Sequence, residues 1–207
     1  MSPDDGMSHM RNRRADVVDH ALGVLDRHGL PDLSMRRIAA ELGVQPSALY
    51  HHFASKQLLL AALADEILRR GTHTQPDPDA PWDERVRGGC HALRDAILAY
   101  RDAAELVATV HAFGLGAHEP HRRLCDDLVD AGFEPSFARD AATTLLHFVL
   151  GHATDEQLHL QANSVGAIDD APLVPADSGR GASFDLGLSL IVDGIRLRHP
   201  SASAAAS

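Results

Sequence analysis

The chain has 207 residues, which is enough for one or two compact domains with a substantial buried core. Its formal net charge of −10 argues against non-specific nucleic-acid binding, which needs a basic surface, and no apolar run approaches the length of a membrane span. Residues 1–56 hold seven acidic and seven basic residues, so the excess of acid lies entirely in the remainder. Two cysteines without CxxC spacing, and an N-terminus without an apolar signal segment, favour a reduced, cytoplasmic protein.

The first predicted helix follows a short basic stretch. Arg11, Arg13 and Arg14 precede an amphipathic pattern that ends at His28 and Gly29, and glycine suits the position after the last helical residue. Two interpretations of the basic triplet stay open. It lies along a phosphate backbone or in a minor groove, or it is a solvated tail.

The stretch 33–56 predicts two short helices joined by a tight turn. Ser34 is a favourable N-cap for the first helix, because its hydroxyl can accept a hydrogen bond from an otherwise unpaired backbone amide. Gly43 supplies a flexible turn position. The second helix begins near Gln45 and has Pro46 as its first residue, where the missing N–H costs nothing.

The second of these helices has one apolar edge and a polar outer side. Leu49 and Phe53 are four residues apart and face inward. The outer side is left to Gln45, Ser47, Tyr50 and His51. A short helix whose outer side carries hydrogen-bonding and aromatic groups fits the major groove of DNA. The alternative is that the two helices belong to an ordinary bundle.

Six further helices and no strand are predicted in the rest of the chain, so we expect an all-α fold. A helix over 56–70 connects the first part of the chain to a proline-rich break at 76–82, and the others cover about 82–100, 103–113, 119–131, 135–161 and 184–198. In the helix over 119–131, we expect Leu124, Leu128 and Val129 to face inward. Residues 163–182 are rich in Gly, Pro, Ser and Asp and predict a mobile loop.

The helices over 135–161 and 184–198 are apolar on more sides than one subunit can cover. This pattern predicts that they also pack against a second copy of the chain. We expect Leu188 and Ile191 to lie at the contact between the two copies.

Signatures of catalysis are absent from the sequence. It contains no GxSxG, P-loop or GxGxxG pattern, so the usual hydrolase, NTPase and dinucleotide-binding signatures are missing. The pairs His118/His121 and His147/His152 do not make an HExxH motif or a compact three-ligand cluster. We therefore expect no enzyme activity, no cofactor and no metal site.

The run Leu49-Tyr50-His51-His52-Phe53, followed by Ser55-Lys56, resembles the DNA-binding domain of the Tet repressor family. The resemblance implies that the second helix of the pair is the recognition helix and that Lys56 touches a phosphate. It implies a helix-turn-helix DNA-binding domain over 11–71 and an effector-binding and dimerisation domain over 72–200. The predicted DNA contacts are Ser34, Arg36, Gln45, Pro46, Ser47, Tyr50, His51 and Lys56.

The C-terminal half is similar to that of the tetracycline repressors at 100–102, 131–133, 147–151 and 156–157. The resemblance implies a small-molecule site, for which the candidate residues are Tyr100, His111, Phe113 and His147. His111 stands about three positions from the histidine that binds magnesium in those repressors, and Thr72 replaces another drug-contacting histidine. We therefore expect an apolar, aromatic or amphipathic effector that binds without a metal.

These observations predict a ligand-responsive repressor that binds a palindromic operator as a homodimer and is released by a small molecule. The alternative is a small-molecule-binding protein of the same fold that has lost operator binding. The acidic total and the absence of basic residues at Pro46 and Ser47 favour this alternative. No membrane partner is expected.

Overall fold

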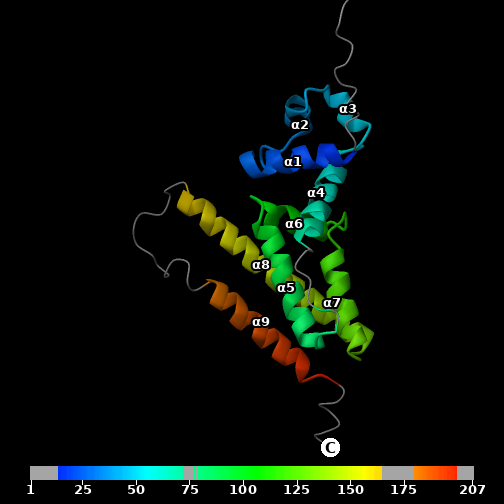
Figure 1. Cartoon of the computed structure of the whole chain (residues 1–207), viewed down its shortest axis with the longest axis vertical. Helices are drawn as coiled ribbons and strands as arrows, with labels where there is room; N and C mark the ends of the chain where they lie inside the picture. The colour runs from blue at the N-terminus through cyan, green and yellow to red at the C-terminus, as the bar shows by residue number, and fades with distance from the viewer. Residues whose placement is uncertain (1–13, 72–76, 78, 165–179, 200–207) are drawn as a thin grey trace, which may run out of the picture.

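The computed structural model describes residues 14–71, 77, 79–164 and 180–199, and within these ranges the chain forms nine α-helices and no strand (Figure 1). The all-α prediction is confirmed. In chain order the helices are α1 (Arg14–His28), α2 (Met35–Glu41), α3 (Pro46–Tyr50), α4 (Lys56–Gly71), α5 (Trp82–Leu98), α6 (Ala103–Ala112), α7 (Glu119–Asp130), α8 (Pro135–Ser164) and α9 (Arg180–Arg196).

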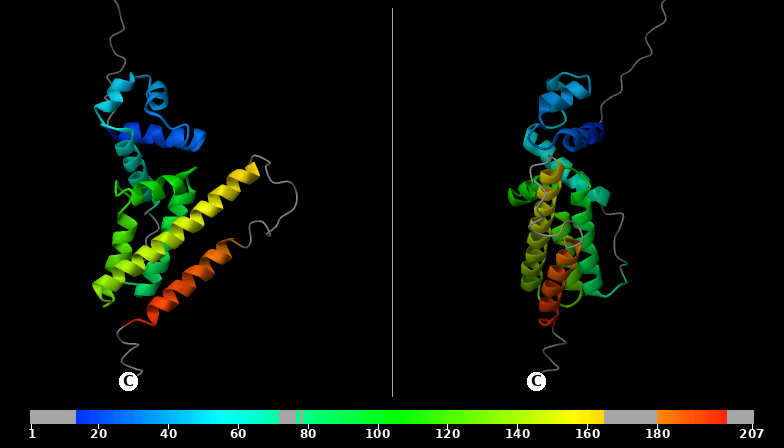
Figure 2. Two further views of the ribbon diagram at one scale, coloured as in Figure 1. Left: turned by 180° about the vertical axis from the view of Figure 1, so that it is seen from behind. Right: turned by 90° about the vertical axis from the view of Figure 1, so that its left-hand side faces the viewer.

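The helices form a small group and a larger one that share α4. Helices α1, α2 and α3 lie at one end of the molecule, and α4 runs from them into the group made by α5 to α9 (Figures 1 and 2). Helices α8 and α9 lie side by side with opposite chain directions. The ends of the predicted loop, 163–164 and 180–182, are helical, whereas 165–179 lies outside the described residues, as do Arg11 and Arg13.

The predicted start and stop signals of the first helices are confirmed. The Ser34 hydroxyl accepts a hydrogen bond from the backbone amide of Arg37, with a distance of 3.2 Å. Gly29 and Gly43 have positive φ angles of 80° and 67°, which non-glycine residues rarely adopt. Pro46 occupies the first turn of α3. These local signals set where α1, α2 and α3 begin and end.

The buried apolar side chains of all nine helices form one connected core in the described part of the chain. Leu49 of α3 and Phe53, which follows α3, are both buried in it and so face inward as predicted, and α3 packs against α2. Gly71 allows α4 to cross α5 closely, because a Cβ atom there would lie 2.1 Å from the Cβ of Ala96. The inward prediction is confirmed for Leu124 and Leu128 of α7 but wrong for Val129, which is exposed.

Leucines on α8 and α9 remain exposed in the single chain. Leu186 and Leu190 of α9 are 63% and 66% exposed, and Leu158 of α8 and Leu197, directly after α9, are exposed as well. Leu188, in contrast, is buried in the core of its own chain, so the prediction that it lies at a contact between two copies is wrong. Helix α9 turns Leu188 toward the chain's own core and presents its other leucines outward. Ile191 is half-buried and also packs against that core.

Among the described residues, no helix has both the length and the hydrophobicity that crossing a membrane requires.

Candidate functional site

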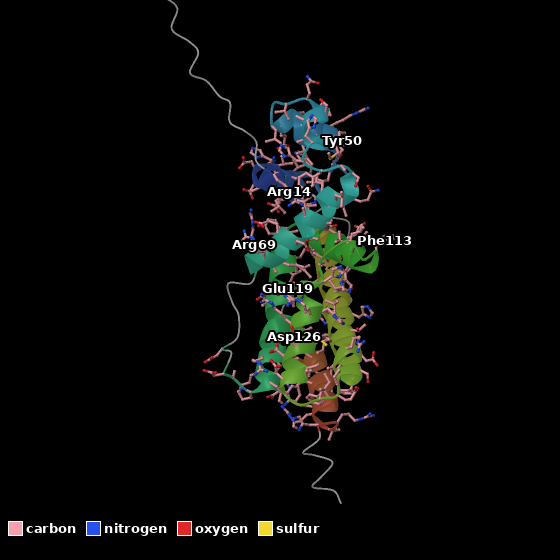
Figure 3. All side chains as sticks on the ribbon, turned by 90° about the vertical axis from the view of Figure 1, so that its right-hand side faces the viewer. Arg14, Tyr50, Arg69, Phe113, Glu119 and Asp126 are labelled. Carbon is pink, nitrogen blue, oxygen red and sulfur yellow. The ribbon has the colours of Figure 1, made fainter. Side chains whose placement is uncertain are left out.

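The outer side of α3 carries the side chains that the sequence predicts for a DNA contact. Tyr50 is 52% exposed, and Gln45, Ser47 and His51 are exposed too (Figure 3 labels Tyr50 at one tip of the molecule). Gln45 is the N-cap residue of α3 by its backbone, but its side chain makes no capping hydrogen bond. Its amide group is therefore not used to stabilise the helix.

The remaining predicted contacts surround α3. Lys56 is exposed and is the first residue of α4, and Arg36 is exposed on α2. Pro46 is half-buried beneath the outer face. Ser34 is also half-buried, and its hydroxyl oxygen already accepts the capping hydrogen bond of α2. Helices α2 and α3 contact each other at the end of the molecule from which α4 runs (Figure 1).

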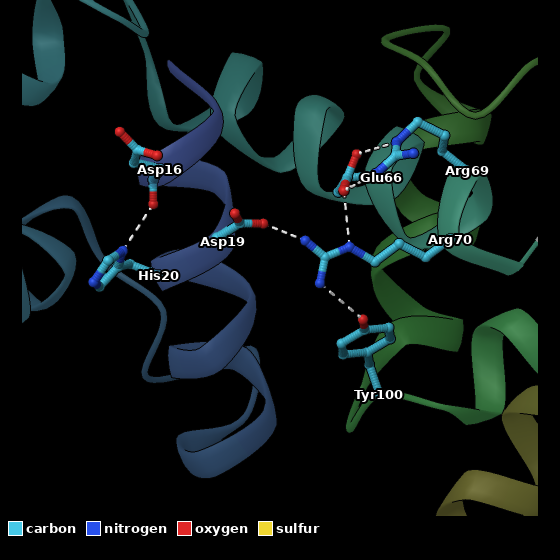
Figure 4. Close-up of polar contacts among 7 residues, drawn as sticks. All are labelled: Asp16, Asp19, His20, Glu66, Arg69, Arg70 and Tyr100. Atoms are coloured by element: carbon cyan, nitrogen blue, oxygen red, sulfur yellow. Dashed lines mark hydrogen bonds and ion pairs between the residues drawn. The ribbon is translucent and has the colours of Figure 1, made fainter. Parts of the chain in front are cut away.

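Arg70, near the end of α4, joins this small helical group to the larger one. Its guanidinium group donates to Asp19 of α1, to Glu66 of α4 at 2.8 Å, and to the Tyr100 hydroxyl at 3.3 Å (Figure 4). Tyr100 lies in the turn between α5 and α6. One side chain therefore ties three segments together at the junction.

Glu66 is held as an anion at this junction. Hydrogen bonds from Arg69 and Arg70 lower the pKa of Glu66 from 4.5 to about 2, against the opposing effect of burial. A lowered carboxyl pKa adds stability above the pH at which the unfolded chain titrates, and this stability is lost as the pH falls toward about 2. The ion pair therefore holds the junction throughout the neutral range.

Asp102 forms a second junction, between α8 and the turn that follows α1. Its backbone is left-handed, with a φ of 56°, and its carboxylate is buried. One oxygen accepts from the backbone amide of Leu30 at 2.7 Å, and the other accepts from the side-chain amide of Gln161 on α8. Gly29 permits this approach, since a Cβ there would lie 2.5 Å from the carboxylate.

Gln157 of α8 also holds the turn between α5 and α6. Its side-chain oxygen accepts from the Ala104 amide at 3.0 Å, and its nitrogen donates to the carbonyl oxygens of Ile97 and Tyr100. Hydrogen bonds therefore hold the turn that carries Tyr100 and Asp102 against α8. Other hydrogen bonds join the same turn to the α1–α4 group.

A cavity of about 860 Å³ lies between α4, α5 and α7. Its volume falls within the range typical of small-molecule sites. The apolar and small residues of its lining, called the floor below, are Leu68, Gly71, Gly89, Ala92, Leu93, Ala96, Pro120 and Leu124. Its charged lining consists of Asp65, Arg69, Arg85, Glu119, Arg123, Asp126, Asp127 and Asp130. Figure 3 shows Arg69, Glu119 and Asp126 in succession along the molecule.

None of the four residues predicted to bind an effector lines this cavity. Tyr100 belongs to the Arg70 junction, and His147 is exposed on α8. Phe113 is 75% exposed at the end of α6. His111 is half-buried, and its Nδ1 atom lies 3.2 Å from the carbonyl oxygen of Ala117.

Three histidines gather where α6 meets α7. The ring centroid of His111 lies 5.7 Å from that of His118 and 6.4 Å from that of His121. Burial lowers the pKa of His111, and the neighbouring histidines lower it further. Within the described ranges, no group of three or more His, Cys, Asp or Glu side chains is arranged to hold a metal ion.

The cavity residues were not predicted from the sequence. They come from three helices that are separated along the chain, and small residues such as Gly89 and Ala92 give no distinctive pattern. One signal was present: Asp126, Asp127 and Asp130 stand in the last turns of α7, where the helix dipole disfavours acids.

Two family models match most of the chain. Residues 17–63 match the model described as bacterial regulatory proteins, tetR family, and residues 75–178 match the tetracyclin repressor-like C-terminal domain. The chain belongs to the TetR family. It is therefore a transcriptional regulator with a helix-turn-helix DNA-binding domain and not an enzyme, as the sequence predicted.

Relatives of this TetR family chain cover nearly its whole length. The Escherichia coli tetracycline repressor protein class A from transposon 1721 is 35% identical over 199 residues, which cover 88% of this chain and 90% of that protein. The crystal structure of Mycobacterium smegmatis BioQ has a TM-score of 0.78 with 42% identity and covers 88% and 96% of the two chains. BioQ with its double-stranded DNA operator matches with a TM-score of 0.70 and 40% identity over the same shares.

Proposed function

We propose that this protein is a cytoplasmic repressor that binds a palindromic operator as a homodimer and is released by a small molecule. The observation that carries the proposal is the exposed outer side of α3, where Gln45, Ser47, Tyr50 and His51 stand on a helix fixed from below by Leu49. The similarity to BioQ, which has been solved with its double-stranded DNA operator, supports operator binding by this chain. Residues 11–71 would form the DNA-binding domain, and 72–200 the domain for effector binding and dimerisation.

The homodimer is supported by the outward leucines of α9 and by the leucine that follows it. Leu186, Leu190 and Leu197 recur at helical spacing along one side, with Gly194 between the last two. Exposed apolar stripes of this kind mark protein–protein contacts. A single helix-turn-helix also buries too little surface for specific binding, whereas two of them match the symmetry of a palindrome.

Substitutions in and beside α3 should separate base reading from phosphate contact. Gln45→Ala is expected to weaken operator binding by about 1–3 kcal/mol and to relax the preference at one base-pair position. Because the Gln45 side chain makes no cap, α3 itself should be unaffected. Lys56→Ala should weaken binding to all sequences alike and lower the salt slope by about one.

Gel-shift titrations at several salt concentrations, against an operator and its single-base variants, measure both effects. Gln57→Ala is the matched control, because Gln57 is exposed next to Lys56 but is not a predicted contact. Unchanged affinity and unchanged base preference in Gln45→Ala, Tyr50→Ala and Lys56→Ala together would remove α3 from the DNA interface.

The cavity between α4, α5 and α7 is our proposed effector site, in place of the four residues predicted from the sequence. Helix α4 carries Lys56 at one end and lines the cavity near its other end, with Leu68 and Gly71. Its 16 residues span about 24 Å. A ligand that prefers one placement of α4 would shift the two recognition helices of the dimer away from operator spacing, whereas equal affinity for both placements would shift nothing.

Filling the cavity should remove the response to effector and spare the fold. A Cβ at Gly89 would meet only the Leu124 side chain, at 3.7 Å, so the α5 backbone tolerates a side chain there. Gly89→Leu is expected to occupy the cavity and abolish effector-dependent release. Gly89→Ala is the control, with release retained, and replacing a helical glycine should raise stability in both variants by up to about 1 kcal/mol.

The measurements are operator release by an active effector and thermal unfolding. Full release of operator from a folded Gly89→Leu protein would exclude this cavity as the effector site.

The alternative function, a small-molecule-binding protein without an operator, is favoured by the net charge of −10. Neutral side chains can nevertheless read bases while a few residues contact phosphates, so the acidic total does not decide against DNA binding.

A further inference from the structure

The charge of the cavity between α4, α5 and α7 discriminates between classes of ligand. Its lining contains five acidic and three basic side chains. Each of the three arginines donates to a carboxylate of the same chain, at distances of 2.6 to 2.7 Å. The pairs are Arg69–Glu66, Arg85–Asp127 and Arg123–Glu119. Positive charge on the lining is therefore already matched by the protein itself.

Among the described residues, three carboxylates of the lining do not accept a hydrogen bond from an arginine. Asp65 accepts a hydrogen bond from the backbone amide of Ala117 at 2.8 Å, which supplies no positive charge. Asp126 lies 4.0 Å from Arg122, beyond hydrogen-bond distance, and Arg122 donates instead to Glu119. Asp130 is the last residue of α7, and within the described ranges it forms no ion pair.

The position of Asp126 and Asp130 on α7 adds to the negative potential. A helix carries a partial negative charge at its C-terminal end, where cations are favoured and anions are not. The last turn of α7 contains no basic residue. The same cavity has an apolar floor, to which Leu93, Leu124 and the small residue Ala92 contribute. Apolar surface beside uncompensated carboxylates suits a ligand with both an apolar body and a positive charge.

We propose that the ligand of this cavity is an organic cation whose apolar or aromatic body lies on the floor and whose charge faces Asp126 and Asp130. The inference rests on the proposed effector role of the cavity and names the chemical class of that effector. It refines the apolar, aromatic or amphipathic ligand expected from the sequence. A bare metal ion is not the fit, because no three His, Cys, Asp or Glu side chains in the described part of the chain are arranged to hold one.

A pair of probes with nearly equal size and opposite charge tests this proposal. Tetraphenylphosphonium is a permanent organic cation, and tetraphenylborate is its anionic counterpart. Calorimetric titration of the full chain should give a dissociation constant for the cation that is lower by at least about tenfold, as expected for an interaction with carboxylates in a partly solvated site. The preference should decrease as salt is added.

Two double variants test whether the preference for the cation depends on Asp126 and Asp130. Asp126→Asn/Asp130→Asn should reduce the preference for the cation by about tenfold. Glu84→Gln/Glu105→Gln removes the same formal charge from exposed positions outside the cavity and should keep the preference. Gly89→Leu should prevent binding of both probes. Thermal unfolding of each variant confirms that it is folded.

Equal affinity for the two probes, or an equal loss in both double variants, would overturn the assignment of a cation. So would undiminished binding of tetraphenylphosphonium to folded Gly89→Leu, since the probe would then bind elsewhere. If an anionic or neutral compound releases the operator and Gly89→Leu blocks that release, the cavity keeps its effector role while the cation assignment fails.

Discussion

Leu190→Asp is expected to convert the protein into monomers that no longer hold an operator. Leu190 is 66% exposed in the single chain, so the substitution leaves the subunit core intact. In a two-fold symmetric dimer the same residue enters the contact twice. Each buried, unpaired carboxylate costs several kcal/mol, and we expect the dimer to be at least about 100-fold weaker.

Analytical ultracentrifugation measures this dimerisation directly, and operator affinity should fall with it. Leu186→Asp should behave in the same way, because it lies one turn away on the same side of α9. Val129→Asp is the matched control, since Val129 is an exposed apolar residue of α7. Intact dimers of both α9 variants at micromolar concentration would discard this interface.

Asp102→Ala is expected to disconnect α8 from the DNA-binding group. The substitution leaves the Leu30 amide and the Gln161 side chain without their shared acceptor. Each buried group left unsatisfied costs about 1–3 kcal/mol. Alanine also tolerates the left-handed backbone of this position less well than aspartate does. We therefore expect a lower free energy of unfolding, together with weaker operator binding by the dimer.

Asp102→Asn is the matched control. Asparagine tolerates the left-handed backbone and keeps an acceptor for the Leu30 amide, so most of the stability should return. Hydrogen exchange at Leu30 reports the bond itself: this amide should be protected in wild type and Asp102→Asn and exchange rapidly in Asp102→Ala. Wild-type stability and wild-type protection of Leu30 in Asp102→Ala would show that this contact does not hold the junction.

The first four helices could be predicted closely because their ends carry local signals. Ser34, Gly43 and Pro46 each act on the backbone of their immediate neighbours, so their effect does not depend on the rest of the fold. The outer side of α3 followed from the four-residue spacing of Leu49 and Phe53.

Which side of each helix faces the core was harder to predict in the C-terminal half. Helix α8 has apolar residues around much of its girth, so periodicity alone could not show that His147 points outward. For α9 the same ambiguity placed Leu188 at a contact between copies, whereas packing on α5 and α8 buries it. The cavity depends on how three helices pack together, which one-dimensional spacing does not encode.

The measurement that tests the central claim most directly is selection of binding sites from a random duplex library by the purified full chain, followed by the stoichiometry of the selected complex. We predict enrichment of a palindrome and two chains for each duplex, with half-sites spaced for two α3 helices. The failure of any sequence to be enriched over the starting library, at a salt concentration where the protein is folded and dimeric, would contradict the account and favour a small-molecule-binding protein without an operator.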